Sequence, residues 1–261
     1  MKKSDKVVLN DKIKNRLKKI KFIILDIDGV TVPRGTKIKQ ISNNMHMRIR
    51  KIPKSEIEKI KQLAKKGYIM GVNSGRGLYL LQDIFRPVLE NLVITYENGS
   101  ATYYKGKIYQ HVNSHSKLNK IQLELEKIKN KDIQGFEPKE FIITIHCKKR
   151  IKEIENTINK HKGIYWIWNG EAYDVGIKEV QTKGYGLKHV MKILKLKKSQ
   201  ILFVGDNYND VPLGKEVGFV VSADKSRLKG DLYVSMHAPK FPAEQVMDIF
   251  SFSSFFLLLY Y

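Results

Sequence analysis

The chain is poor in cysteine. Cys147 is the single cysteine among 261 residues, so an internal disulfide and a thiolate metal cluster are both excluded. Because it lies in the apolar run 141–147, we expect a buried, unreactive thiol. A chain of this kind suits a reducing compartment, and we expect a cytoplasmic location.

Long apolar segments are also missing. The basic first twenty residues contain no continuous apolar stretch of the kind a signal peptide needs. The apolar run 255–261 is far shorter than the ~20 residues that cross a bilayer. We therefore expect no membrane span, and 251–261 is predicted to be an apolar tail that serves as a packing arm, an interface segment or a disordered end.

Acidic residues are scarce beside basic ones. The chain has 48 lysines and arginines against 26 aspartates and glutamates, a net charge of +22. This excess favours anionic partners such as nucleic acid, acidic lipid or phosphorylated metabolites, although a lysine-rich solvated surface is the alternative. The basic segments 1–21 and 34–54 are candidate polyanion contacts. Within the latter, 36–50 is predicted to be a β-hairpin with a cationic face, or a flexible basic loop.

Short apolar runs alternate with amphipathic segments over much of the chain. This alternation predicts an α/β fold with a parallel sheet covered on both faces. Ser55 and Glu58 form a capping box at the start of one helix. The predicted strands are 20–26, 68–73, 92–96, 201–204 and 219–221, and the predicted helices are 55–66, 78–85, 183–194 and 211–217.

Between these parts the pattern changes to antiparallel hairpins with helices. Asn169-Gly170 is a strong hairpin turn signal between two short aromatic runs, and a second hairpin is predicted at 101–112. We therefore expect an α+β unit inserted into a discontinuous domain. The expected division is a core of 1–99 and 179–250, an insert of 100–178, and the tail of 251–261.

Acidic side chains follow two of the predicted strands. Asp26 and Asp28 are two residues apart, so in extended backbone they face one site. Asp206 and Asp210 follow the strand 201–204. Open α/β sheets bind ligands at the carboxyl ends of their strands, so we expect all four acids at one edge. For the first pair alone, an ordinary turn is the alternative.

Groups suited to phosphate lie at two helix starts. Ser74, Gly75 and Arg76 offer a hydroxyl and backbone N–H groups where a helix begins, and Lys183 begins another helix. A carboxylate that attacks a phosphate dianion is repelled by like charge, which a divalent cation beside Lys183 would neutralise. Mg²⁺ suits such oxygen ligands. The expected ligands are Asp26, Asp28, Asp206 and Asp210.

The segments DIDGVT, NSGR, TKGYG and GDNYND, in this order, resemble the four motifs of the haloacid dehalogenase superfamily of phosphatases. The insert resembles the cap of its subgroup of Cof-type sugar phosphatases, archaeal phosphoglycolate phosphatases and trehalose- and sucrose-phosphate phosphatases. The resemblance covers residues 20–236. It implies a Rossmann-like core with an α+β cap, and an Mg²⁺-dependent phosphatase for a small phosphorylated metabolite, either a sugar phosphate or phosphoglycolate.

The resemblance also implies roles for residues at the matching positions. Asp26 would be the nucleophile that forms an aspartyl-phosphate, and Asp28 the general acid and then the base. Ser74 and Lys183 would bind the transferring phosphoryl group, and Asn209 would contact the phosphate or the metal shell. The implied metal ligands are Asp26, the Asp28 backbone carbonyl, Asp206 and Asp210.

The insert would act as a lid that excludes water and selects the leaving group. In it, His146 and the basic residues 148–150 are candidates for binding a second anionic group, with a solvated strand end as the alternative. Two other functions stay open: a phosphomutase of the same superfamily, and a nucleic-acid or polyanion binder. A homo-oligomer is a further possibility.

Overall fold

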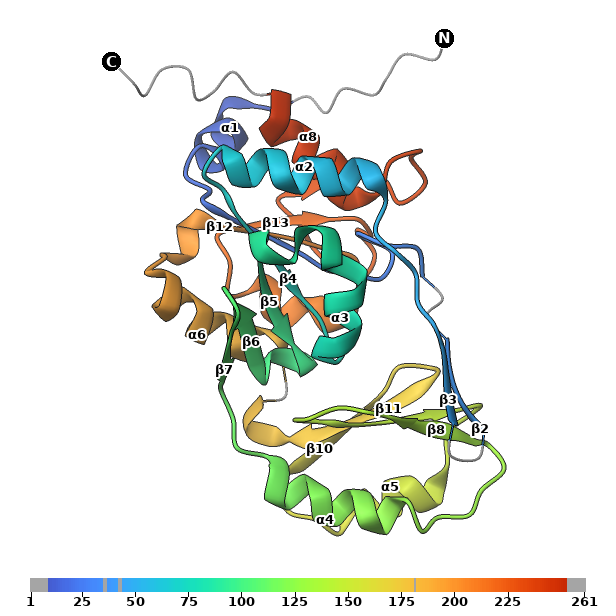
Figure 1. Cartoon of the computed structure of the whole chain (residues 1–261). Helices are drawn as coiled ribbons and strands as arrows, with labels where there is room; N and C mark the ends of the chain where they lie inside the picture. Colours follow the sequence, from blue (N-terminus) through green and yellow to red (C-terminus); the bar gives the residue numbers. More distant parts are fainter. Residues whose placement is uncertain (1–8, 35–36, 42–43, 181, 253–261) are drawn as a thin grey trace.

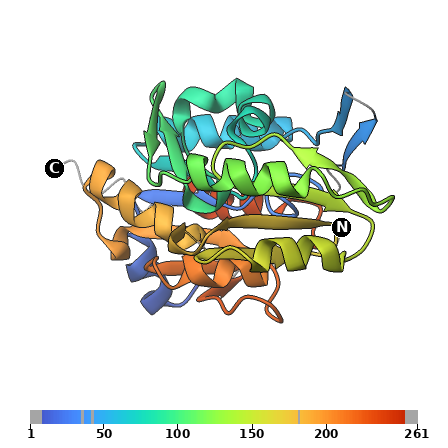
Figure 2. The same ribbon diagram turned by 90° about the horizontal axis from the view of Figure 1, so that it is seen from below.

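The structure, a computed structural model, describes residues 9–34, 37–41, 44–180 and 182–252. Two sheets organise it: an eight-stranded main sheet, and a four-stranded antiparallel cap sheet that lies below it (Figure 1). Seen from below, the helices of the cap lie in front of the main sheet (Figure 2). The predicted α/β class, a Rossmann-like parallel core with a separate α+β cap, is confirmed.

The main sheet has the strand order β14-β13-β12-β1-β4-β5-β6-β7, parallel from β14 to β5 and antiparallel from there. All strands of the parallel part therefore present their carboxyl ends at one edge. Its strands are β1 (Phe22–Leu25), β4 (Ile69–Asn73), β5 (Leu92–Tyr96), β6 (Ala101–Tyr104), β7 (Lys107–Gln110), β12 (Ile201–Gly205), β13 (Phe219–Ser222) and β14 (Leu232–Tyr233).

Helices cover both faces of the main sheet. Ile23 and Leu25 of β1 pack in one core cluster, with α2, α3 and α8, while Phe22 and Ile24 pack in another, with α6 and α7. Because neither face meets water, β1 is apolar at every position. The helices are α1 (Asp11–Leu17), α2 (Lys54–Lys65), α3 (Leu78–Phe85), α6 (Lys183–Leu194), α7 (Val211–Gly214) and α8 (Pro242–Phe252), with short 3-10 turns η1 (Arg86–Asn91), η2 (Glu97–Gly99), η3 (Lys178–Val180), η4 (Lys198–Gln200) and η5 (Tyr208–Asp210).

The cap sheet has helices on its outer face only. In β9, Ile143, Ile145 and Cys147 pack against the helices, while Thr144 and His146 point to the opposite face. Cys147 is buried, as predicted. The order is β10-β11-β9-β8. The elements are α4 (His115–Leu125), β8 (Ile133–Glu137), β9 (Ile143–Cys147), α5 (Lys152–Asn159), β10 (Ile164–Trp168) and β11 (Ala172–Ile177).

The predicted basic hairpin is present as β2 (Lys37–Ile41) and β3 (Asn44–Arg48), which pair antiparallel and lie beside β8 of the cap (Figure 1). Of the basic segments, residues 1–8, 35–36 and 42–43 lie outside the described residues, as does 253–261 of the apolar tail. Contact with a polyanion stays a prediction. Every helix in the described ranges is too short or too polar to span a bilayer.

The hairpin at 101–110, which the sequence pattern predicts to belong to the inserted unit, lies in the main sheet. The turn at 97–100 folds the chain back, so β6 pairs with β5 and extends the main sheet, with Ile94 opposite Tyr103. Alternation along a strand does not specify which sheet the strand joins. We therefore propose that the inserted unit begins after Gln110.

The predicted capping box at Ser55 is also wrong. Helix α2 begins at Lys54 with Pro53 as its N-cap, and no side chain caps it. The Ser55 hydroxyl instead donates to Glu244 of α8, at 3.1 Å. The tertiary contact with α8, which the local sequence does not reveal, takes the place of the local cap.

A buried acid lies where α2 packs against α8. Glu56 is fully buried, and neither of its carboxylate oxygens has a hydrogen-bond partner among the described residues. Burial and the nearby Glu244 raise the pKa of Glu56 to about 9, against the opposing effect of Lys59. An unfolded glutamate ionises near pH 4.5. Stability is therefore greatest below that value and falls as the pH rises toward 9.

Glu56→Gln replaces the ionisable carboxyl group with a neutral amide of nearly the same shape. We expect its free energy of unfolding, relative to the parent chain, to rise by roughly 1 kcal/mol per pH unit between pH 5 and pH 8. Denaturant unfolding across that range measures the difference. Glu58→Gln, at an exposed position of the same helix, is the matched control. A difference in the free energy of unfolding that stays constant with pH would contradict the raised pKa of Glu56.

Candidate active site

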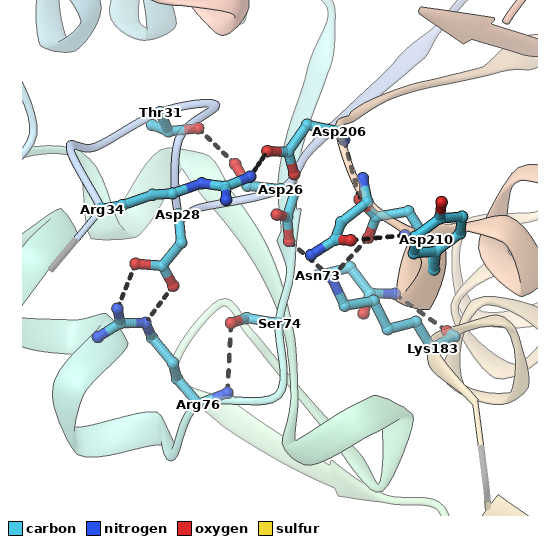
Figure 3. A network of polar contacts seen from close by, with 12 residues as sticks. Asp26, Asp28, Thr31, Arg34, Asn73, Ser74, Arg76, Lys183, Asp206 and Asp210 are labelled. Atoms are coloured by element: carbon cyan, nitrogen blue, oxygen red, sulfur yellow. Dashed lines mark hydrogen bonds and ion pairs between the residues drawn. The ribbon is translucent and has the colours of Figure 1, made fainter. Parts of the chain in front are cut away.

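Polar side chains from four stretches of the chain meet at the carboxyl edge of the main sheet (Figure 3). Asp26 follows β1, Ser74 follows β4, Asp206 follows β12, and Lys183 is the first residue of α6. They line a cleft of about 400 Å³ between the main sheet and the cap. The sequence-predicted residues Asp28, Gly75, Arg76 and Asn209 line the same cleft.

Lys183 is the centre of a buried charge network. Its Nζ donates to Asp26 Oδ1 at 2.6 Å and to Asp210 Oδ1 at 2.7 Å. Desolvation favours the neutral amine, but the two carboxylates outweigh it and raise the pKa of Lys183. Burial and the charge of Asp210 raise the pKa of Asp26, while Lys183 opposes that shift. The ammonium therefore holds two acids together that would otherwise repel each other.

The backbone fixes the acids as firmly as Lys183 does. The second oxygen of Asp210 accepts the N–H groups of Asp206, at 3.0 Å, and Asn207, at 3.1 Å. A Cβ at Gly205 would lie 2.6 Å from that oxygen, so only glycine leaves room for it. The Asn73 amide donates to the Lys183 carbonyl at 3.1 Å and holds the start of α6 beside β4.

Three of the four predicted metal ligands form one group. Asp26, Asp206 and Asp210 are buried, and each offers an oxygen within 4.8 Å of the other two. A compact set of carboxylate oxygens fits a hard cation such as Mg²⁺ better than a softer metal. The donor set in this structure is therefore compatible with the predicted cofactor.

The Asp28 side chain lies outside that group and binds Arg76 instead. The guanidinium donates to both carboxylate oxygens, with Nε 2.9 Å from Oδ2. Such bidentate pairing fixes the orientation of the carboxylate. From the sequence we expected only the backbone N–H of Arg76 to contribute to the site. In the structure, the side chain of Arg76 also positions Asp28.

Arg34 also belongs to the site, although the sequence predicted it only as part of the basic segment 34–54. Its guanidinium pairs with Asp206, whose side chain is almost fully buried (Figure 3). Burial raises the pKa of Asp206, and Arg34 opposes this shift. Arg34 thus compensates the third acid as Lys183 compensates the other two. No local pattern distinguishes Arg34 from the other basic residues of its segment, because its partner is 172 residues away in the sequence.

Ser74 lies where the sequence placed it, at the turn into α3. Its Oγ accepts the Arg76 N–H at 3.2 Å, and its own N–H donates to Thr95 of β5. The hydroxyl hydrogen is then available for a phosphate oxygen. Asn98, which the sequence analysis did not assign, lies beside this turn: a Cβ at Gly75 would be 2.9 Å from its Oδ1.

The cap closes the cleft with polar side chains. Lys139 Nζ donates to Thr144 Oγ1 at 2.7 Å and lies 3.5 Å from Glu137 and 3.7 Å from Asp174. His146 hydrogen-bonds to Glu137 at 3.1 Å. Of the predicted anion-binding candidates, only His146 lines this cleft. Lys149 and Arg150 pair elsewhere in the cap, with Asp132 and Glu155.

Residues 110–227 match the family model described as haloacid dehalogenase-like hydrolase. The match includes Lys183, Asp206 and Asp210, and the main sheet places Asp26 beside them. The match covers a little under half of the chain, and over this part the chain is similar to haloacid dehalogenase-like hydrolases. A comparison with curated proteins finds no match to this sequence.

Solved structures with low sequence identity share the fold of this chain over most of its length. A protein of Eubacterium rectale is 16% identical, with a TM-score of 0.68 over 89% of this chain and 99% of that one. A haloacid dehalogenase-like hydrolase of B. subtilis is 14% identical (TM-score 0.61, 88% and 98%). The superfamily phosphatase BT1666 of Bacteroides thetaiotaomicron is 14% identical (TM-score 0.63, 95% and 99%).

Removing the Lys183 ammonium at the centre of this site is expected to destabilise the fold. Lys183→Met leaves Asp26 and Asp210 buried without a counter-charge, which costs about 3 kcal/mol or more. Chemical denaturation in EDTA measures the free energy of unfolding without a divalent cation to compensate. Lys188→Met, at an exposed position of the same helix, is the control. Equal stability of the two variants would contradict the central role of Lys183.

Proposed function

We propose that this protein is a phosphomonoesterase that works through an aspartyl-phosphate. The observation that carries the proposal is the buried group of Asp26, Lys183 and Asp210 at the carboxyl edge of the sheet. Lys183 occupies one oxygen of Asp26, and no described residue hydrogen-bonds to the other. One carboxylate oxygen is therefore left to attack phosphorus, next to a fixed positive charge.

The remaining residues supply the proton transfers. Asp26 would form a bond to phosphorus as the bond to the leaving oxygen breaks, and Asp28 would protonate that oxygen. Asp28 would then remove a proton from the water that attacks the phosphoenzyme and releases phosphate. Arg76 donates to both carboxylate oxygens of Asp28 in this structure and so orients it. Ser74 and the backbone N–H groups after it would hold the phosphate oxygens.

Magnesium is the proposed cofactor. Asp26, Asp206 and Asp210 are the residues that would hold it, since their oxygens form one compact group. When bound, Mg²⁺ supplies positive charge that offsets the repulsion between these acids and the substrate dianion. Arg34, which pairs with Asp206 in this structure, would be a further residue able to contact the phosphate.

The cap side of the cleft favours a leaving group with hydroxyls over one with a carboxylate. It presents three acids, Glu137, Glu171 and Asp174, and the one ammonium among them, Lys139, already pairs with two. Burial raises the pKa of Glu137, but Lys139 and His146 outweigh it and lower it overall, so Glu137 is ionised at neutral pH. Carboxylates accept hydrogen bonds from sugar hydroxyls and repel a second anion.

The nucleophile is tested by Asp26→Asn in purified protein with Mg²⁺ and a panel of phosphomonoesters. We expect the parent chain to hydrolyse at least one ester and EDTA to abolish the activity. Asp26→Asn should lower kcat by at least about a thousandfold, because an amide oxygen is a poor nucleophile. Asp11→Asn, exposed in α1, is the control. A kcat of Asp26→Asn close to that of the parent chain would exclude an aspartyl-phosphate formed on Asp26.

The same panel tests the leaving group. We expect hexose and pentose phosphates to have a kcat/KM at least about tenfold above that of phosphoglycolate, since its carboxylate would meet the acidic cap wall. Glu171→Gln removes one acid at an exposed position. It should lower the ratio of kcat/KM for the sugar phosphates to kcat/KM for phosphoglycolate. A preference of the parent chain for phosphoglycolate would contradict the proposal that the acids of the cap disfavour a leaving group with a carboxylate.

A further inference from the structure

Glu97 is a buried acid outside the phosphate site, and its carboxylate connects the main sheet to the cap. It follows β5, is 1% exposed, and accepts three successive backbone N–H groups from the cap. Glu140 N lies 3.1 Å from both carboxylate oxygens, Phe141 N is 2.6 Å from Oε2, and Ile142 N is 3.1 Å from Oε2. These donors belong to 138–142, the loop that joins β8 to β9.

Burying this carboxylate is unfavourable by itself. Burial raises the pKa of Glu97 to about 7, and the backbone hydrogen bonds from the loop are the main opposing influence. The backbone is also in an unfavourable conformation, since Glu97, Asn98 and Gly99 all have positive φ, at 48°, 58° and 92°. Two adjacent non-glycine residues in this region are costly and persist only where the surroundings require them.

The strained turn contacts two parts of the site, the segment 74–76 and the start of α6. The N–H of Glu97 donates to the Arg76 carbonyl, and that of Asn98 donates to the Ser74 carbonyl. Gly99 packs directly on Gly186 of α6, the helix that begins with Lys183: a Cβ on Gly99 would lie 2.7 Å from the Gly186 nitrogen. The turn is thus held by the segment 74–76 and by the start of α6.

On the cap side, the loop and the start of β9 carry residues that face the cleft. Lys139 lies directly before the three donors and Thr144 two residues after them, and their side chains hydrogen-bond to each other across the loop. Phe141 reaches into the main core cluster and packs on Tyr96, with ring centroids 6.0 Å apart. The loop therefore touches the core at the Glu97 carboxylate and at one aromatic ring.

We propose that Glu97 is a positioning residue that docks the 138–142 loop of the cap onto the core and thereby sets the place of Lys139 and Thr144 in the cleft. The hydrogen bonds fix the loop, and the left-handed turn ties the carboxylate to the Ser74 loop and to α6. The Glu97 side chain then connects the cap wall to the phosphate site, together with the packing of Phe141 on Tyr96. The consequence for catalysis rests on the proposed phosphatase function, whereas the docking itself does not.

Hydrogen–deuterium exchange of the full chain tests the docking without reference to activity. In Glu97→Gln, the amide NH₂ replaces one acceptor and the charge is lost, so exchange of peptides spanning 138–143 should accelerate by at least about tenfold. Peptides from β12 should not change. Glu140→Gln makes the same chemical change on an exposed side chain of the loop and should leave exchange as in the parent chain.

Unchanged exchange of the loop in folded Glu97→Gln would overturn the proposal, and so would equal acceleration in β12, which indicates general loss of stability. Should Glu97→Gln fail to fold, Glu97→Asp carries the test. Its carboxylate is one methylene shorter and does not reach all three N–H groups, so we expect faster loop exchange, and unchanged exchange would again overturn the proposal.

Kinetics then test the effect on the cleft. With the phosphomonoester that the parent chain hydrolyses best, Glu97→Gln should raise KM at least about fivefold with a smaller change in kcat, and Glu97→Asp should restore part of the loss. An unchanged KM would overturn the link from docking to substrate binding. A panel without any activity would count against the proposed function alone, since the exchange result still decides the docking.

Discussion

The structure depends on one buried ammonium group. Asp26 and Asp210 each lose most of their hydration, and without Lys183 between them their repulsion would open the edge where the strands end. This requirement explains several features of the surrounding chain. Helix α6 must begin at Lys183, and position 205 must be glycine so that the second oxygen of Asp210 reaches the backbone N–H groups.

Much of this arrangement could be predicted from the sequence, because the relevant signals are local. The apolar run before Asp26 specifies a buried strand, and a polar residue directly after such a strand lies at the ligand-binding edge whatever the rest of the chain does. The helix Lys183–Leu194 and the strand Leu92–Tyr96 have the predicted bounds. Their ends coincide with breaks in the apolar periodicity, which can be recognised from the sequence alone.

What the sequence did not reveal depends on contacts between distant segments. Arg34 and Glu97 act through partners 172 and 43 to 45 positions away, and no local pattern distinguishes either from a surface charge. Helix α8 and strand β8 were not predicted, because α8 is stabilised by packing on α2, and β8 is interrupted at Gly135 by a register shift against β9. The hairpin at 101–110 was predicted to belong to the inserted unit for the same reason.

The two halves of the cleft carry different chemistry. The half built on the main sheet matches each acid with a cation: Lys183 with Asp26 and Asp210, Arg34 with Asp206, and Arg76 with Asp28. The cap half has more acids than cations. Because four acids share three cations in the first half, a phosphate would need the proposed Mg²⁺ there, and under the proposed function a leaving group with hydroxyls would face the second half. Because the halves belong to different sheets, the orientation of a bound ester depends on how rigidly the sheets are joined, and Glu97 lies at that junction.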